Sequence, residues 1–299
     1  MSGEADTRGL AFRQDYFEDP AGWRAISDLL MDVFGVDISP LDRLGGHDRS
    51  NMPSAFFDAD GRCVANFSAF AMPVMIGGQR VNAAAWQSGA VREEFRGRGL
   101  FRELIRITLQ RCEAAGFGAI ILYTDKPGLY EPYGFRAFRE QSFAGPTPLA
   151  GGKVSATRRL SVENPDDLAL LRQALAKRTP VSHRIAVCDQ SLMFLLNAWL
   201  VEDVRLTWLE EARAVIAWRM GETGDFELLD IVAADIPLLA DITASLGVTA
   251  PRSIVHFPRD LLDWQGEAME PEGDLVFMMR AAPELWPQEP FRLSPMAEF

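Results

Sequence analysis

A strand, a glycine-bearing loop, a helix and a second strand follow one another between residues 81 and 124, and this order constrains the fold most. Residues 81–91 have the composition of a strand, and the polar loop at 92–99 reads Arg-Glu-Glu-Phe-Arg-Gly-Arg-Gly. A helix then begins at Leu100, with apolar residues along one face, and ends near Gly116. A short apolar strand follows at 119–124. A chain that alternates strand and helix in this way predicts an α/β domain.

The remainder of the first half adds mainly antiparallel strands. A strand is expected at 9–17, followed by a helix that starts at Pro20. The turn signal Asp58-Ala-Asp-Gly61 predicts a hairpin between strands at 54–57 and 62–73. A last strand is expected at 135–143. The fold class is therefore a mixed sheet of the α+β kind with helices packed on it.

The chain is long enough for two domains of about 150 residues each. The Gly- and Pro-rich segment 145–152 is a candidate linker. We expect one domain at residues 1–150 and a second at 151–299. The expected elements of the second domain are helices at 165–177, 191–200, 236–246 and 260–264, and strands at 204–208, 214–219, 226–232, 253–257 and 275–280. Their order repeats that of the first half, without a residue-level repeat.

The loop before the helix has the features of an anion site. The first turn of a helix has unpaired backbone N–H groups and a partial positive charge, which suit a pyrophosphate. Gly97 and Gly99 allow a close approach of the backbone and positive φ angles, and Arg96 and Arg98 add positive charge. On these four residues alone, a basic surface turn is an equally good interpretation.

Two elements in this order resemble the GCN5-related N-acetyltransferase (GNAT) family. The family's coenzyme A signature, Arg/Gln-x-x-Gly-x-Gly/Ala, is similar to Arg96-Gly-Arg-Gly-Leu-Phe101, where Phe101 departs from the usual small residue. The segment Leu129-Tyr-Glu-Pro-Tyr-Gly-Phe135 is similar to the family's Phe-Tyr-x-x-x-Gly-Phe. The resemblance covers residues 8–143 and implies the GNAT fold.

The resemblance implies an acetyl-coenzyme A-dependent N-acetyltransferase with no metal. It implies that the strand end at Val91 pairs with the pantetheine amides and that residues 96–101 hold the pyrophosphate. The implied cofactor-binding residues are Val91, Arg96, Gly97, Arg98, Gly99, Leu100 and Phe101. Tyr130 stands where the family places a general acid, and a phenol remains protonated at neutral pH. A packed aromatic without a catalytic role is the alternative for Tyr130.

The acceptor amine must also lose a proton to a base. Glu93, Glu94 and Asp125 are carboxylates near the expected site. A subset of the family, the enhanced-intracellular-survival type, places the C-terminal carboxylate in the site, and this sequence also ends in phenylalanine. Phe299 is therefore a second candidate catalytic residue.

Under the same resemblance, residues 151–299 are similar to a second, degenerate GNAT-like copy. The loop after the strand at 226–232 reads Ala233-Ala-Asp-Ile-Pro237 and has neither glycine nor arginine. We expect Asp235 to cap the next helix, with Pro237 in its first turn. This domain then shapes the acceptor pocket and binds no nucleotide cofactor.

Charge and composition limit the partners. The net charge is -12, with 16 Lys+Arg against 19 Asp+Glu in residues 1–150 and 14 against 23 in 151–299. An acidic chain repels nucleic acid and is compatible with a cationic acceptor, which we expect to be a small-molecule or peptide amine. The three cysteines and three histidines lack metal-ligand spacing, and no signal peptide or membrane span is expected, which predicts a cytoplasmic protein. The alternatives are a non-catalytic acyl-coenzyme A sensor, or a transferase with another acyl donor or an oxygen acceptor.

Overall fold

The computed structural model describes residues 4–201, 203–270 and 273–299, and its contacts divide them into two compact units. Unit 1 contains residues 4–71, 82–123 and 299. Unit 2 contains the other described residues, which are 72–81 and those within 124–298. Each unit therefore takes residues from separate parts of the sequence. The expected functional boundary at residue 150 stays a prediction.

Unit 1 contains five strands of a seven-stranded sheet, in the order β1-β2-β3-β6-β7. Neighbouring strands are antiparallel except β6 and β7, which are parallel. The strands are β1 (Ala11–Gln14), β2 (Ser54–Phe57), β3 (Cys63–Ala71), β6 (Ala83–Val91) and β7 (Ala119–Thr124). The helices are α1 (Pro20–Phe34), α2 (Pro40–Arg43) and α3 (Leu100–Ala114).

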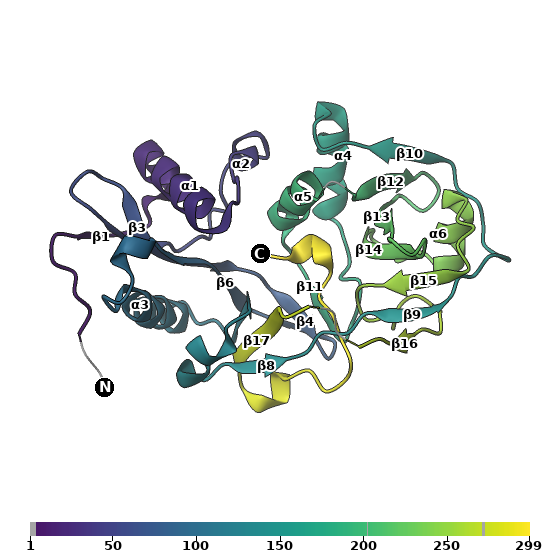
Figure 1. The fold of residues 1–299 in the computed structure, drawn as a ribbon. Coiled ribbons are helices and arrows are strands. Elements are labelled where there is room, and N and C mark those ends of the chain that lie inside the picture. The colour runs from purple at the N-terminus through teal and green to yellow at the C-terminus, as the bar shows by residue number, and fades with distance from the viewer. Residues whose placement is uncertain (1–3, 202, 271–272) are drawn as a thin grey trace. The chain divides into compact units, whose positions relative to one another are not determined.

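Helices cover both faces of this sheet. Figure 1 shows α1 on one side of β3 and β6 and α3 on the other. Every residue of β3 from Cys63 to Phe70 is buried, as expected for a strand covered on both faces. The helix α1 begins at Pro20, next to the N-cap Asp19, and ends at Gly35 in the left-handed conformation. The predicted start of this helix is confirmed.

Unit 2 contains a seven-stranded sheet in the order β10-β12-β13-β14-β15-β9-β16. Its strands are β10 (Thr157–Leu160), β12 (Arg205–Leu209), β13 (Ala214–Met220), β14 (Phe226–Val232), β15 (Arg252–Val255), β9 (Phe143–Pro146) and β16 (Glu267–Ala268). Its helices are α4 (Pro165–Leu175), α5 (Ser191–Leu200) and α6 (Leu239–Leu246).

Further short elements complete unit 2. A small antiparallel sheet joins β11 (Ile185–Val187), β4 (Val74–Ile76) and β5 (Gln79–Val81), and β17 (Val276–Ala281) pairs with β8 (Arg136–Phe138). Among the described residues, the 3-10 turns of both units are Tyr16–Glu18, Glu93–Phe95, Pro127–Leu129, Glu131–Tyr133, Pro283–Leu285 and Pro295–Ala297.

The order of elements is the same in the two units. In each, a strand and two helices precede three antiparallel strands, a helix and a strand parallel to the third. In unit 2 the short β11 stands between the two helices and belongs to the small sheet. This order agrees with the mixed α/β fold class and is compatible with two copies of one fold.

Several predicted elements were wrong in detail. The single strand predicted at 135–143 is two strands, β8 and β9, because the chain turns between them and the N–H of Gln141 donates to Phe291 O at 2.7 Å. Part of the expected linker lies in β9. The helix predicted at 260–264 is a turn, because Asp260 accepts from Ser182 and the N–H of His183, and Asp263 has a left-handed φ of 44°.

Candidate functional site

The strand β6 separates from β7 halfway along its length. Parallel pairing joins only Ala83–Ala85 to Ala119–Ile121. Within the described part of the chain, Trp86–Val91 have no strand partner on the β7 side, although they continue to pair with β3. A strand edge without a partner presents backbone N–H and C=O groups that a ligand's amides can bind.

A β-bulge lies in this separated half of β6. The register with β3 shifts between Asn66 and Ser68, and Ser88 adopts a left-handed φ of 55°. The side chain of Asn66 donates to Ser88 O at 2.9 Å and accepts from the hydroxyl of Tyr16 at 2.7 Å. Because bulges redirect a strand, these buried contacts fix where β6 ends. The sequence reasoning missed the bulge, although a glycine inside a strand, Gly89, is its usual signal.

The loop after β6 reaches the first turn of α3 through two glycines in the left-handed conformation. Gly97 has a φ of 76° and Gly99, the N-cap of α3, has a φ of 77°. A helix that starts at a glycine has no side chain at the N-cap to accept its first N–H groups. Leu100 anchors the helix start in the core at 1% exposure. The loop geometry is that of an anion site at a helix N-terminus.

Phe101 is accommodated by a glycine on the neighbouring strand. Its ring packs edge-on against Phe67 at 5.5 Å between centroids. A Cβ on Gly89 would lie 2.7 Å from Phe67 and 3.1 Å from Phe101, so the missing side chain makes room for both rings. The departure of Phe101 from the family pattern is therefore paired with Gly89 in the same unit.

The two loop arginines make different contacts. Arg96 is exposed, and its Nε donates to Val91 O at 3.3 Å. Arg98 donates to the carbonyls of Asp6 and Arg8, at 2.9 and 2.8 Å, and lies over the ring of Phe95. The guanidinium of Arg98 thus holds the N-terminal segment against the loop, while that of Arg96 can reach an incoming anion.

Tyr130 lies in unit 2, in the turns that follow β7. It is 8% exposed and packs against Phe135 at 6.1 Å between ring centroids. Burial raises the pKa of Tyr130 to about 12, and the negative charge of Asp125 adds to the shift. The phenol therefore keeps its proton at neutral pH, as a proton donor must.

Phe299 packs into unit 1. Its ring lies 5.8 Å from that of Phe70 and 5.4 Å from that of Tyr123. Phe70 is opposite Ala85, the last β6 residue that pairs with β7, so the ring lies where the two strands separate. The preceding carbonyl, of Glu298, accepts from Asn197 Nδ2 at 2.8 Å.

The other carboxylates considered as bases face solvent. Glu93 and Glu94 are exposed, and Glu94 pairs with Arg62. Asp125 is exposed and lies 3.6 Å from Lys126 Nζ. Neither of these two contacts brings a carboxylate to the separated half of β6.

The corresponding loop of unit 2 differs from the expectation. The helix α6 starts at Leu239, its N-cap is Leu238, and no side chain caps it. The predicted cap at Asp235 and the first-turn position of Pro237 were therefore wrong, because the chain stays non-helical through Leu238. The loop still lacks glycine and arginine.

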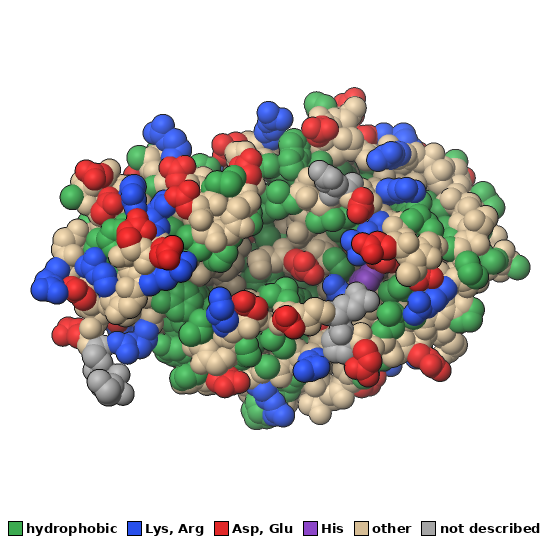
Figure 2. All heavy atoms as spheres, in the orientation of Figure 1, with side chains coloured by type: hydrophobic (Ala, Val, Ile, Leu, Met, Phe, Trp, Pro, Cys, Tyr) green, Lys and Arg blue, Asp and Glu red, His purple; other side chains and the backbone are tan. Residues whose placement is uncertain are grey.

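No group of three or more His, Cys, Asp or Glu side chains within residues 4–201, 203–270 and 273–299 could hold a metal ion. No helix of that part of the chain is both long and apolar enough to cross a bilayer. On the face shown in Figure 2, acidic and basic side chains are interspersed.

Comparisons with known proteins agree with this geometry. Residues 19–138 match the model of an acetyltransferase (GNAT) domain. No curated protein matches the chain. Similar solved structures include a probable N-acyltransferase from Enterococcus faecalis (TM-score 0.59, 14% identity, 90% of this chain and 71% of that one). Others are a GCN5-related N-acetyltransferase from Kribbella flavida (0.57, 18%, 91% and 71%) and Eis1 from Mycobacterium abscessus (0.58, 13%, 90% and 73%). At these identities the likeness establishes the fold.

Proposed function

We propose that this chain is an acyltransferase that transfers acetyl from acetyl-coenzyme A to an amine, because residues 19–138 match the model of an acetyltransferase (GNAT) domain. The acceptor is a small-molecule or peptide amine. The observation that carries the proposal is the pair of left-handed glycines at the start of α3, directly after the separated half of β6.

The residues of the loop fit a pyrophosphate. A Cβ at Gly97 would meet nothing within 4 Å, so the backbone is open to a large anion there. The helix start supplies N–H donors and a partial positive charge, and Arg96 and Arg98 supply full charges. We assign the pyrophosphate to Arg96–Phe101 and the pantetheine amides to the β6 edge that ends at Val91. The carbonyl of Val91 must then release the Arg96 side chain.

Stabilisation of the departing thiolate is assigned to Tyr130. Bound acetyl-coenzyme A would supply an activated thioester. The Tyr130 hydroxyl, with its raised pKa, would donate to the sulfur as the C–S bond breaks. A free thiol has a pKa of about 8.5, so the thiolate is a weaker base than the phenolate and full proton transfer is uphill; the phenol therefore stabilises the departing sulfur chiefly by donating a hydrogen bond as negative charge develops there.

Proton removal from the amine is assigned to the α-carboxylate of Phe299. The ring contacts with Phe70 and Tyr123 support this assignment, because they hold residue 299 beside the point where β6 leaves β7. Glu93, Glu94 and Asp125 lack a comparable contact with that part of the sheet.

The test is a calorimetric titration with acetyl-coenzyme A of the wild type, Gly97→Asp and Gly224→Asp. Both glycines have positive φ and open space around them, so the two variants carry the same backbone strain. We expect one bound equivalent, an affinity at least about 100-fold weaker in Gly97→Asp, and wild-type affinity in Gly224→Asp. A folded wild type that binds no acetyl-coenzyme A would contradict the proposal, and so would equal losses in both variants.

A further inference from the structure

A pocket of about 480 Å³ lies on the sheet of unit 2, and its lining contains none of the residues assigned above. Its lining includes Arg159 of β10, Arg205 and Thr207 of β12, and Trp218 of β13. Arg159 is opposite Thr207 and Arg205 is opposite Trp218 in the strand register. Directly opposite residues on antiparallel strands share a face, so these four side chains project from one side of the sheet.

Among the residues that the structure describes, the two arginines of this pocket have no carboxylate partner. Unit 2 is rich in acidic residues, and Arg178, Arg219 and Arg252 each form an ion pair with one. In contrast, neither Arg159 nor Arg205 lies within ion-pair distance of an acidic group in the described ranges. The neighbour of Arg159 on the opposite face, Arg158, is paired with Asp167. Two uncompensated guanidinium groups in one pocket attract an anion.

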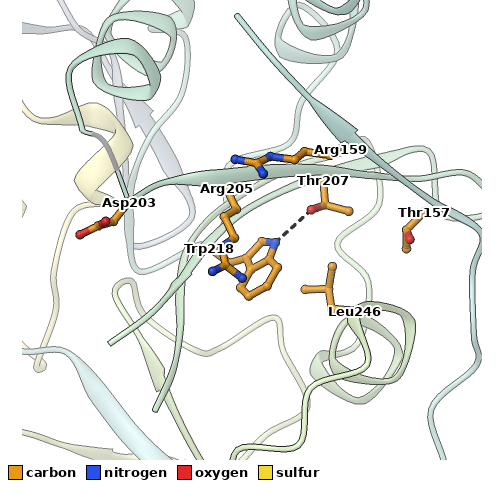
Figure 3. Close-up of a pocket in the computed structure, with 7 residues that line it drawn as sticks. All are labelled: Thr157, Arg159, Asp203, Arg205, Thr207, Trp218 and Leu246. Atoms are coloured by element: carbon orange, nitrogen blue, oxygen red, sulfur yellow. Dashed lines mark hydrogen bonds between the residues drawn. The ribbon is translucent and has the colours of Figure 1, made fainter. Parts of the chain in front are cut away.

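The position of Arg205 is set by Trp218. The guanidinium carbon of Arg205 lies 4.8 Å from the centre of the indole ring, and the indole N–H donates to Thr207 Oγ1 at 3.0 Å. Figure 3 shows the guanidinium of Arg205 beside the indole and the hydrogen bond from the indole to Thr207, with the side chain of Arg159 in the same view. A stacked guanidinium is held in place while its N–H groups remain available to a ligand.

The donors of the pocket suit a phosphate better than a carboxylate. Thr207 already accepts from the indole, so its hydroxyl hydrogen is free to donate, and Thr157 adds a second hydroxyl to the lining. Two guanidinium groups and two hydroxyls donate more hydrogen bonds than the two oxygens of one carboxylate can accept. A phosphate ester has three terminal oxygens and up to two negative charges, so it can accept more of them. Leu246 and the indole offer apolar surface to the rest of the ligand.

We propose that this pocket binds a small organic phosphate through Arg159 and Arg205. Asp203, at one end of the pocket (Figure 3), would accept a hydrogen bond from a hydroxyl or amino group of the same ligand. The site is separate from the residues assigned to acetyl-coenzyme A, and it does not depend on that assignment.

The test is a calorimetric titration in phosphate-free buffer with phenyl phosphate, inorganic phosphate and benzoate as probes. We expect phenyl phosphate to bind most tightly, and its affinity to fall at least about tenfold in Arg159→Gln and again in Arg159→Gln/Arg205→Gln. Arg139→Gln, which removes an exposed arginine of the same unit, is the matched control and should bind as the wild type does.

Three outcomes would overturn the proposal: no binding of either phosphate, binding that survives the double substitution, and benzoate binding as tight as that of phenyl phosphate. Both arginines are exposed, so their substitution should leave the unfolding temperature unchanged. Two cross-measurements separate a failure of this proposal from a failure of the acetyltransferase proposal. The double variant should still bind acetyl-coenzyme A, and Gly97→Asp should still bind phenyl phosphate.

Discussion

The strands that precede α3 and α6 hold the same place in the order of elements, but they differ in charge. The strand β6 contains no ionisable residue, whereas β14 contains Glu227 and Asp230. Both acids are paired: Glu227 with Arg219 and His256, and Asp230 with Arg178. An uncharged strand can lie beside a bound anion, while an acidic strand disfavours one.

The edges of the two strands are also used differently. In β14, parallel pairing with β15 covers only Phe226–Leu228, so this strand separates from its neighbour as β6 does. The space beyond is taken by Arg178, which donates to Ile231 O, and by Thr179, whose N–H donates to Ala233 O. In β6 the carbonyl of Val91 is bonded by an exposed side chain, that of Arg96. The fold supplies the separation in both units, and the residues decide whether a ligand can enter it.

The largest expected effect is on stability, from a substitution at the edge of β14, which Arg178 and Thr179 occupy. Arg178→Ala leaves Asp230, which is 1% exposed, as an unpaired buried charge, and this should cost about 3–5 kcal/mol of stability. We expect the unfolding temperature to fall by about 10 °C or more while the acetyl-coenzyme A affinity of the folded protein stays unchanged. Arg62→Ala, which breaks the exposed pair with Glu94, is the control and should leave the unfolding temperature nearly unchanged. If Arg178→Ala and Arg62→Ala lowered the unfolding temperature equally, Arg178 would not be the residue that fills the edge of β14.

The next effect concerns the chemistry after β7. The four tyrosines of the chain are residues 16, 123, 130 and 133. All of them come before β14, so the segment from β14 to α6 in unit 2 contains no tyrosine. Tyr130→Phe should lower kcat about 100-fold with little change in acetyl-coenzyme A affinity, because it removes a proton donor and keeps the ring. Tyr133→Phe, in the same turn, should retain activity. Steady-state rates of thiol release with a panel of amines measure both, and a Tyr130→Phe enzyme as active as Tyr133→Phe would exclude the role.

A smaller loss is expected when residue 299 no longer carries the α-carboxylate. Adding one alanine after Phe299 keeps the ring that packs on Phe70 and Tyr123 and moves the negative charge by one residue. If this carboxylate takes the amine proton, kcat should fall about tenfold or more and the lower limb of its pH profile should shift. Unchanged turnover and an unchanged pH profile would show that this carboxylate is not the base. The edge of β14 in unit 2 offers no chain end at which to make an equivalent variant.

The smallest expected effect is the pH dependence of stability that Glu227 of β14 and its partner His256 produce. The hydrogen bond from His256 and the charge of Arg219 lower the pKa of Glu227 to about 2, and burial lowers the pKa of His256. Both groups bind protons more weakly in the folded state, so stability is full above their unfolded pKa values and falls with pH. From pH 7 to 5 the histidine contributes, and below about 4.5 the glutamate does.

Thermal unfolding from pH 7 to 4 measures this dependence. We expect His256→Asn to reduce the fall in unfolding temperature between pH 7 and 5, because the buried imidazole, whose pKa is lowered by burial, is no longer there to be protonated. His47→Asn, at a half-buried position of unit 1, is the control and should leave that slope unchanged. A wild-type slope in the His256→Asn protein would show that β14 does not set the acid sensitivity.

The sequence predicted those features that depend on neighbouring residues. The run from Val81 to Thr124 gave the order strand, loop, helix and strand, because glycines and apolar periodicity are local signals. The bulge at Ser88 depends on a hydrogen bond from Asn66, which is 22 residues away, and periodicity does not show such a partner. The position of Phe299 against Phe70 and Tyr123 is likewise a distant contact.

The pocket on the second sheet was missed for the same reason. Nothing in the sequence separates Trp218 from the other tryptophans of the chain, for which core packing is the simpler interpretation. Arg159 and Arg205 are 46 residues apart, and only the register of β10, β12 and β13 brings them to one face. Whether an arginine has a carboxylate partner is a property of the folded chain.

The interleaving of the two units has a consequence for how the protein is made. Residue 299 packs in the unit that contains residues 4–71, so that unit lacks its last aromatic ring until residues 124–298 have left the ribosome. Segment 72–81, in turn, must wait for β11 before its small sheet can form. Domains usually fold in the order of synthesis, but here neither half can finish early. Long-range contacts of this kind slow folding, and we expect the nascent chain to need protection until residue 299 has emerged.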